Sequence, residues 1–69
     1  MNLDLTGRQF LTHFELLFLI NGIRALWAED RYAYVTIRAH RGMLLQLKLL
    51  TRWFGRADYR QDLIEVIEV

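Results

Sequence analysis

The chain has 69 residues, of which 54% are apolar and 13% aromatic, and its formal net charge is +1. A chain this short forms at most one domain, spanning residues 1–69, and buries only about 60% of the surface that its unfolded form exposes. Because there are no cysteines and only two histidines, disulfides and a structural metal are poor candidates for reinforcing the thin core. The apolar surplus therefore predicts self-association, in its simplest form a homodimer.

The sequence shows neither a signal peptide pattern nor a membrane-spanning segment. The amino-terminal segment lacks the cationic, apolar and small-residue order of a signal peptide. The longest apolar run, Leu16–Ile20, is much shorter than the roughly 20 residues that cross a bilayer. Together with the missing cysteines, these features predict a cytoplasmic protein that does not bind a membrane.

The first predicted element is a long helix. Thr6 followed by Gln9 is a capping-box pattern that places the helix start near Gly7, and apolar residues then recur at helical spacing as far as about Trp27. Asn21-Gly22 could interrupt it, because this dipeptide also favours a hairpin or a left-handed helix end. The flanking segments are rich in leucine, alanine and phenylalanine, which favours one continuous helix.

A second long helix is predicted after a polar break at residues 28–30. From Tyr32 to Phe54 apolar residues step by three or four, which predicts a helix of about 24 residues with Gly55 as its C-terminal cap. An alternative structure is possible for the first part of this segment. Strand propensity is high just after Tyr32, so a strand at 32–39 followed by a helix from Gly42 is also compatible with the pattern.

The last segment has two readings. Asp58 with Gln61 three residues later indicates a short C-terminal helix. The run Leu63–Val69 is rich in β-branched residues and could instead be extended.

These elements predict an all-α fold. Two long helices joined by a short loop pack as an antiparallel hairpin, and with the short C-terminal helix the hairpin would homodimerise into a four-helix-type bundle. The alternative is an α+β fold with the strand at 32–39. The first helix has an apolar side wider than one partner helix needs, so we expect it to supply the dimer interface. The residues concerned are Phe10, Phe14, Leu17, Ile20, Ile23 and Trp27.

Charge is strongly segregated along the chain. Residues 1–30 sum to −2, residues 31–56 to +6 without a single acid, and residues 57–69 to −3. On a continuous second helix the central cations would share one face, opposite the apolar stripe. Tryptophan beside arginine is enriched at interaction hot spots. The predicted partner-binding residues are therefore Arg38, Arg41, Lys48, Arg52 and Trp53. A solvated face, an acidic protein surface and nucleic acid are the three environments that such a face could meet.

Catalytic chemistry is not indicated. Serine and cysteine are absent, and His13 and Glu15 are two residues apart, which puts them on different sides of a helix. No spacing typical of zinc or calcium ligands occurs, and the glycines are scattered. We expect a non-enzymatic protein with no catalytic residue, no metal site and no cofactor.

In length and character the chain resembles the small phage-encoded proteins that shut down host machinery, and more narrowly phage-encoded quorum-sensing anti-activators. The resemblance implies a compact protein without catalytic residues that occupies the functional surface of a host regulator, such as a transcription activator. It assigns no role to an individual residue. The alternative is a small DNA-binding repressor dimer, since a strand followed by two helices resembles ribbon-helix-helix proteins in outline.

Overall fold

The structure is a computed structural model that describes all 69 residues. Strands and helices alternate along the chain, and a short 3₁₀ turn lies on either side of the second helix. In order, the elements are β1 (Asn2–Asp4), α1 (His13–Glu29), β2 (Val35–Ala39), a 3₁₀ turn (Arg41–Met43), α2 (Leu44–Asp58), a second 3₁₀ turn (Gln61–Leu63) and β3 (Ile64–Glu68).

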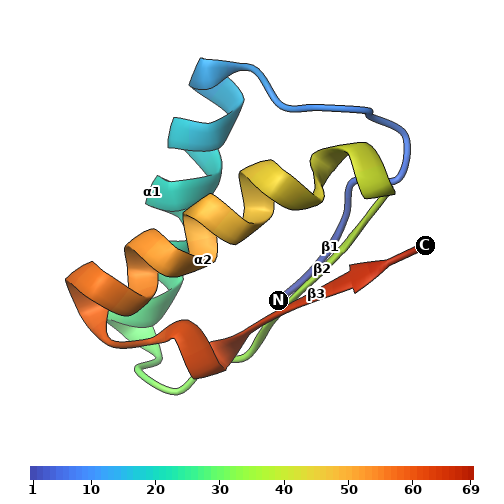
Figure 1. The fold of residues 1–69 in the computed structure, drawn as a ribbon. Helices are drawn as coiled ribbons and strands as arrows, with labels where there is room; N and C mark the ends of the chain where they lie inside the picture. The colour runs from blue at the N-terminus through green and yellow to red at the C-terminus, as the bar shows by residue number, and fades with distance from the viewer.

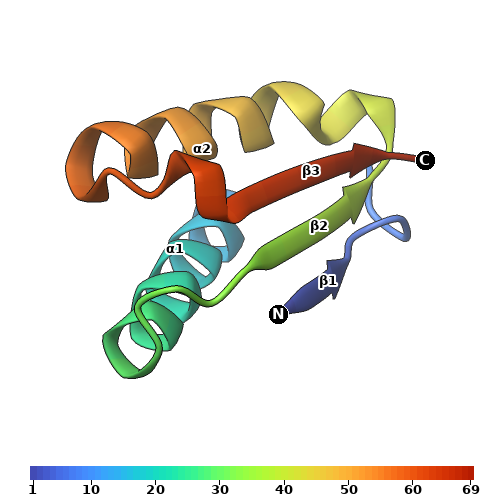
Figure 2. The ribbon, with the colours of Figure 1, turned by 90° about the horizontal axis from the view of Figure 1, so that it is seen from below.

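The three strands form one parallel sheet in the order β1-β2-β3. Both helices lie on the same face of this sheet and cross each other there, so the molecule has two layers (Figures 1 and 2). Parallel sheets are usually covered on both faces. Here the second face is open.

The predicted all-α hairpin is wrong, and the four-helix-type bundle built from it has no basis in this fold. Residues 35–39 form the central strand, with Val35 and Ile37 fully buried against the helices while Arg38 points to the open face. The strand alternation of period two was hidden because apolar residues in this stretch also happen to step by three and four. The alternative, a strand at 32–39 followed by a helix from Gly42, gives the correct order of elements, although the strand begins only at Val35 and α2 only at Leu44.

The start of the chain also differs from the prediction. Residues 2–4 are a strand, and Thr6 donates its backbone N–H (3.0 Å) and its hydroxyl (2.6 Å) to Asp4 Oδ1, which closes a turn after the strand. The capping box that starts α1 is formed by Thr12 and Glu15. The continuous helix through Asn21-Gly22 is confirmed.

The end of α2 lies one turn beyond its predicted cap. Gly55 is inside the helix, and Tyr59 provides the left-handed C-cap with a φ of 57°. A Cβ on Gly55 would lie 2.7 Å from Oε1 of Gln61, so the glycine allows the second 3₁₀ turn to approach the helix. The predicted C-terminal helix is replaced by this 3₁₀ turn and β3, which confirms the extended alternative for the tail.

One apolar core lies between the sheet and the helices. Trp27 of α1 meets Phe54 of α2 edge to face, with ring centroids 5.0 Å apart, and its indole N–H donates to the Ala33 carbonyl at 2.9 Å. The core consists of Leu11, Ile23, Trp27, Val35, Ile37, Ala39, Met43, Leu47, Leu50, Phe54 and Ile64. Neither helix combines the length and the apolar character needed to cross a bilayer.

Candidate protein-docking surface

The predicted partner-binding residues do not share one face. Arg38 is on the open face of the sheet and Arg41 is in the first 3₁₀ turn, because the helix on which they were placed begins only at Leu44. Lys48 and Arg52 are exposed on α2, as their predicted helical position required. Of the predicted cations, only Lys48 and Arg52 therefore share one face.

The α2 cations form a regular row. Lys48, Arg52 and Arg56 follow each other at intervals of four residues, so they lie along one side of the helix. The two ion pairs in the structure are Arg8–Glu15 and Arg24–Asp58, which leaves all three cations of the row without an acidic partner. Arg56 was missing from the predicted set because the helix was expected to end at Gly55. Its four-residue spacing from Arg52 is the signal that could have found it.

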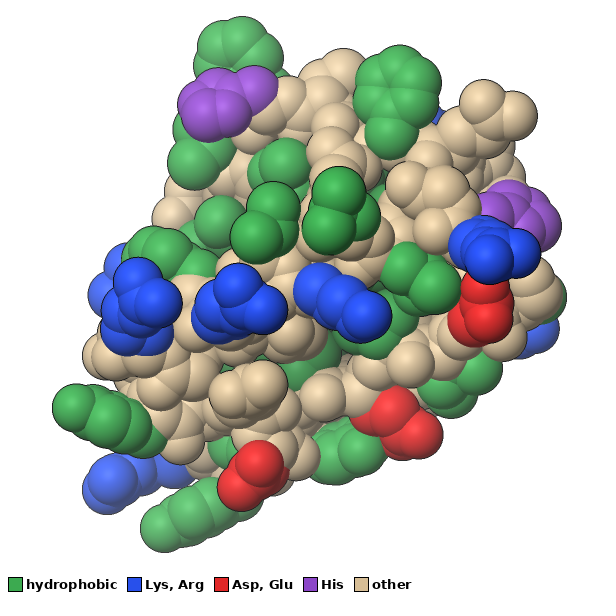
Figure 3. Space-filling model, in the orientation of Figure 1, with side chains coloured by type: hydrophobic (Ala, Val, Ile, Leu, Met, Phe, Trp, Pro, Cys, Tyr) green, Lys and Arg blue, Asp and Glu red, His purple; other side chains and the backbone are tan.

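Exposed apolar side chains accompany this row. Leu45, Leu49 and Trp53 also recur every four residues on α2, and they are 71%, 56% and 41% exposed. Figure 3 shows basic side chains in a line across the helical layer with hydrophobic side chains directly beside them. We call these three apolar residues and the three cations the α2 face.

An apolar groove lies between α2 and α1. It has a volume of about 310 Å³ and is lined by Leu16 and Ile20 of α1 and by Gln46, Leu49, Leu50 and Trp53 of α2. The single polar lining residue is already occupied. The Gln46 amide accepts from the Leu11 N–H and donates to the Leu11 carbonyl, both at 2.8 Å. The groove therefore presents apolar surface to a ligand.

The predicted dimer-interface residues are divided between surface and core. Phe10 in the loop before α1, and Phe14 and Leu17 on α1, are exposed, and Ile20 is partly buried in the groove. Ile23 and Trp27 belong to the core, so they cannot form an interface without unfolding the molecule.

On α1, the prediction of the dimer interface missed the exposed residue Phe18. It is 84% exposed, and it follows Phe14 at a spacing of four residues. Phe14, Leu17 and Phe18 make up what we call the α1 face.

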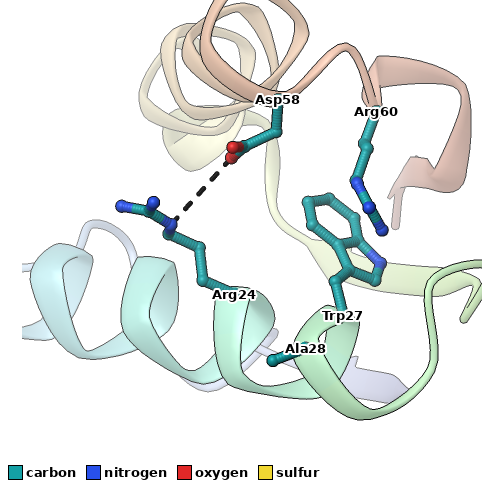
Figure 4. Close-up of a pocket in the computed structure, with 5 residues that line it drawn as sticks. All are labelled: Arg24, Trp27, Ala28, Asp58 and Arg60. Atoms are coloured by element: carbon teal, nitrogen blue, oxygen red, sulfur yellow. Dashed lines mark ion pairs between the residues drawn. The ribbon is translucent and has the colours of Figure 1, made fainter.

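A separate hollow of about 210 Å³ joins the C-terminal ends of the two helices (Figure 4). Arg24 reaches across from α1 toward Asp58 of α2, with 4.0 Å between Nε and Oδ2. Arg60 stacks 5.4 Å from the centre of the Trp27 ring and donates to the Arg31 carbonyl at 2.5 Å. Asp58 Oδ2 is buried and has no hydrogen-bond partner, so Arg24 compensates its charge only through the ion pair. We interpret this cluster as a connection between the helix ends.

The carboxyl ends of the strands border another hollow, of about 550 Å³, which is lined by Gln9, Phe10, His40, Arg41, Gly42 and Val69. Ligands of parallel sheets bind where the strand order reverses. The order β1-β2-β3 contains no such reversal. The lining also lacks an acidic side chain or a nucleophile beside His40.

Three side chains have shifted pKa values, and local hydrogen bonds are the main cause of each shift. The hydrogen bonds from Thr6 lower the pKa of Asp4, and those from Thr12 lower the pKa of Glu15. The bond from the Tyr34 hydroxyl to Glu65 raises the pKa of that tyrosine. All three belong to turns, a helix cap or a cross-strand contact, and none belongs to the α2 face. No three histidine or acidic residues are grouped as metal ligands would be.

Comparison of the chain with models of protein families, with curated proteins and with solved structures found no match.

Proposed function

We propose that the protein is a non-enzymatic interaction protein that binds and inhibits or modulates a regulatory protein, as the resemblance to phage-encoded anti-activators implies. The observation that carries this proposal is the α2 face, where exposed Leu45, Leu49 and Trp53 lie beside a row of unpaired cations. Exposed apolar patches of this kind are typical of interaction sites. Aromatic and arginine side chains are the residues most often found at hot spots.

Charge indicates the sign of the partner surface. The acids Asp4, Glu65 and Glu68 lie on the sheet, away from α2, and between Leu44 and Ala57 the helix carries no acid. A partner surface rich in aspartate or glutamate would satisfy the cations, steer association and penalise basic competitors.

Self-association is the second part of the proposal. The α1 face carries Phe14 and Phe18, 81% and 84% exposed, and the one charged residue between them, Glu15, is already paired with Arg8. At roughly 200 Å² for each aromatic side chain, these two alone expose on the order of 300 Å², a sizeable part of the about 800 Å² that each subunit contributes to a standard interface. A second copy of the chain fits this largely apolar surface.

The test is affinity capture with paired charge reversals. Lys48→Glu/Arg52→Glu reverses the charge of two of the three cations in the row. The control, Arg31→Glu/Arg38→Glu, makes the same change in net charge at exposed positions outside α2. We expect wild type and control to recover the same regulatory protein, and the α2 variant to recover on the order of tenfold less. Recovery of nucleic acid alone, or equal loss with both variants, would contradict the proposal.

Light scattering tests the dimer separately. Phe14→Ser/Phe18→Ser should shift the molecular mass from dimer to monomer, while Arg41→Glu should leave it unchanged. A dimer that survives the double phenylalanine substitution would show that the α1 face is not the interface.

A further inference from the structure

We infer that the groove between α1 and α2 is a receptor for an acidic amphipathic helix, whose apolar side enters the groove and whose acidic side meets the cation row of α2. The inference rests on the proposed function and specifies the part of the partner that the α2 face recognises. Helix-in-groove binding is a recurring mode in which a few apolar anchors at helical spacing provide most of the contact.

The depth of the groove supports an inserted side chain. Its floor is formed by Leu16, Ile20 and Leu50, which are partly or fully buried, and its outer wall by the more exposed Leu49 and Trp53. Because α1 crosses α2 instead of running alongside it, the two helices diverge and leave an open angle between them (Figure 1). With Gln46 bonded to Leu11, an apolar anchor would leave no polar group unpaired there.

The cation row supports a helical ligand. Lys48 and Arg56 are eight residues apart on α2, which separates them by about 12 Å along the helix axis. Acids at intervals of four residues on a bound helix repeat with the same spacing, so a single straight ligand can pair with all three cations. Leu45 and Leu49 lie between the cation row and the groove. The same ligand would therefore direct leucine or phenylalanine side chains over these residues and into the groove.

A second copy of this chain does not fit the groove. Its helices offer only Glu15, Glu29 and Asp58 as acids. Glu15 is paired with Arg8, and Asp58 lies against Arg24, so no row of free carboxylates is available to the α2 cations. For a ligand that is a helix, charge complementarity therefore favours a different, acidic chain.

Flat anionic surfaces also fit less well. A membrane or a duplex could contact the cations and the tip of Leu45, but neither inserts a side chain as far as Leu16 or Ile20. Both are included as alternative outcomes of the test below.

The test is selection from a displayed library of amphipathic helical peptides of about 18 residues, roughly 27 Å in length. We expect wild-type protein to enrich glutamate or aspartate at intervals of four residues beside leucine or phenylalanine. An enriched peptide, labelled for fluorescence anisotropy, should bind at least about tenfold more weakly to Lys48→Glu/Arg52→Glu. Leu49→Ser should weaken it by about fivefold or more, while the matched control Phe18→Ser, on the α1 face, leaves it unchanged.

Enriched peptides without an acidic excess, or equal binding to Leu49→Ser and wild type, would overturn the inference. So would binding confined to vesicles containing phosphatidylserine or to duplex DNA, each assayed in parallel. If the peptides fail while cellular capture still depends on Lys48 and Arg52, the proposed function stands and the acidic-helix inference alone is wrong. If cellular capture does not depend on these cations but the selected peptides bind as described, the groove binds acidic helices and the proposed function is wrong.

Discussion

The two helices pack on the same sheet face but leave different surfaces to solvent. On α1, only Ile23 and Trp27 are fully buried, and its outer side carries Phe14, Leu17 and Phe18. On α2, a buried stripe faces the sheet and a row of cations lies outside it. The exposed apolar residues of α1 thus have no row of unpaired cations beside them, whereas those of α2 do. This difference is why we propose a different partner for each surface, a second copy for the α1 face and an acidic chain for the α2 face.

The comparison also separates residues that support the fold from residues that are free for contact. Trp27 and Trp53 illustrate this. Trp27 is 4% exposed and packs on Phe54, whereas Trp53 is 41% exposed and lines the groove, although Trp53 also packs edge to face against Phe54. One phenylalanine in the core therefore positions both tryptophans.

Substitution of Phe54 should have the largest effect. Phe54→Ala leaves a cavity beside both tryptophans and should lower the free energy of unfolding by about 3–5 kcal/mol. Phe18→Ala, at an 84% exposed position, should change it by no more than about 0.5 kcal/mol when the chain is monomeric. Urea denaturation at low protein concentration measures both.

Repeating the measurement of Phe18→Ala and Phe54→Ala at high protein concentration tests the proposed dimer as well. A self-associating α1 face should increase the cost of Phe18→Ala as the dimer becomes populated, because dimerisation stabilises the folded state. A cost for Phe18→Ala as large as that for Phe54→Ala in the monomer would break the distinction between core and free face.

The helical glycines Gly22 and Gly55 should respond in opposite directions. Gly22 of α1 has open space where a Cβ would lie, so Gly22→Ala should raise the free energy of unfolding by about 0.5–1 kcal/mol. Gly55→Ala would place a methyl group 2.7 Å from Gln61 Oε1 and 3.0 Å from its Cβ, which should remove that gain and destabilise the protein. Thermal unfolding of the two variants compares them directly. Equal stabilisation would show that the 3₁₀ turn does not pack closely on α2.

The two helices also differ at their starts: α1 begins with a capping box that includes the carboxylate of Glu15, whereas no side chain caps α2. The stability of the protein should therefore depend on acid pH partly through the start of α1. The hydrogen bonds from Thr12 lower the pKa of Glu15, so its contribution is present above the ordinary pKa of glutamate and is lost as the pH falls through the lowered value. Glu15→Gln keeps a capping side chain but cannot ionise. It should therefore show a shallower loss of thermal stability over this acidic range, with Asp4→Asn as a comparison for the other lowered carboxyl. If wild type and Glu15→Gln lose thermal stability equally as the pH falls, Glu15 does not contribute to the acid dependence.

Local signals predicted the parts of the fold that depend on neighbouring residues. The continuity of α1 through Asn21-Gly22, the exposed cations of α2 and the extended alternative for the tail were all readable from composition and spacing. The start of α1 was misplaced because Thr6 with Gln9 and Thr12 with Glu15 are both capping-box patterns. Only Thr12 with Glu15 caps a helix in the structure, because Thr6 instead donates hydrogen bonds to Asp4 in the turn after β1.

The docking surface could be predicted only in part. Lys48, Arg52 and Trp53 were placed correctly on one helix, α2, and are exposed there, while their role in binding stays a prediction. Arg38 and Arg41 were grouped with them because a 24-residue helix was assumed. Arg56 and Phe18 were missed although each follows a predicted site residue at four-residue spacing.

By itself, the sequence determined that the chain has more apolar surface than its size can bury, that its cations are concentrated between residues 31 and 56, and that its helices are rich in leucine. The tertiary structure decided which of those residues are core and which are free. The reason is the parallel sheet: β2 pairs with β1 and β3 across long sequence separations, through hydrogen bonds that no local pattern specifies. Once β2 is central, both helices must cover one face, and only then do the groove and the α2 face exist.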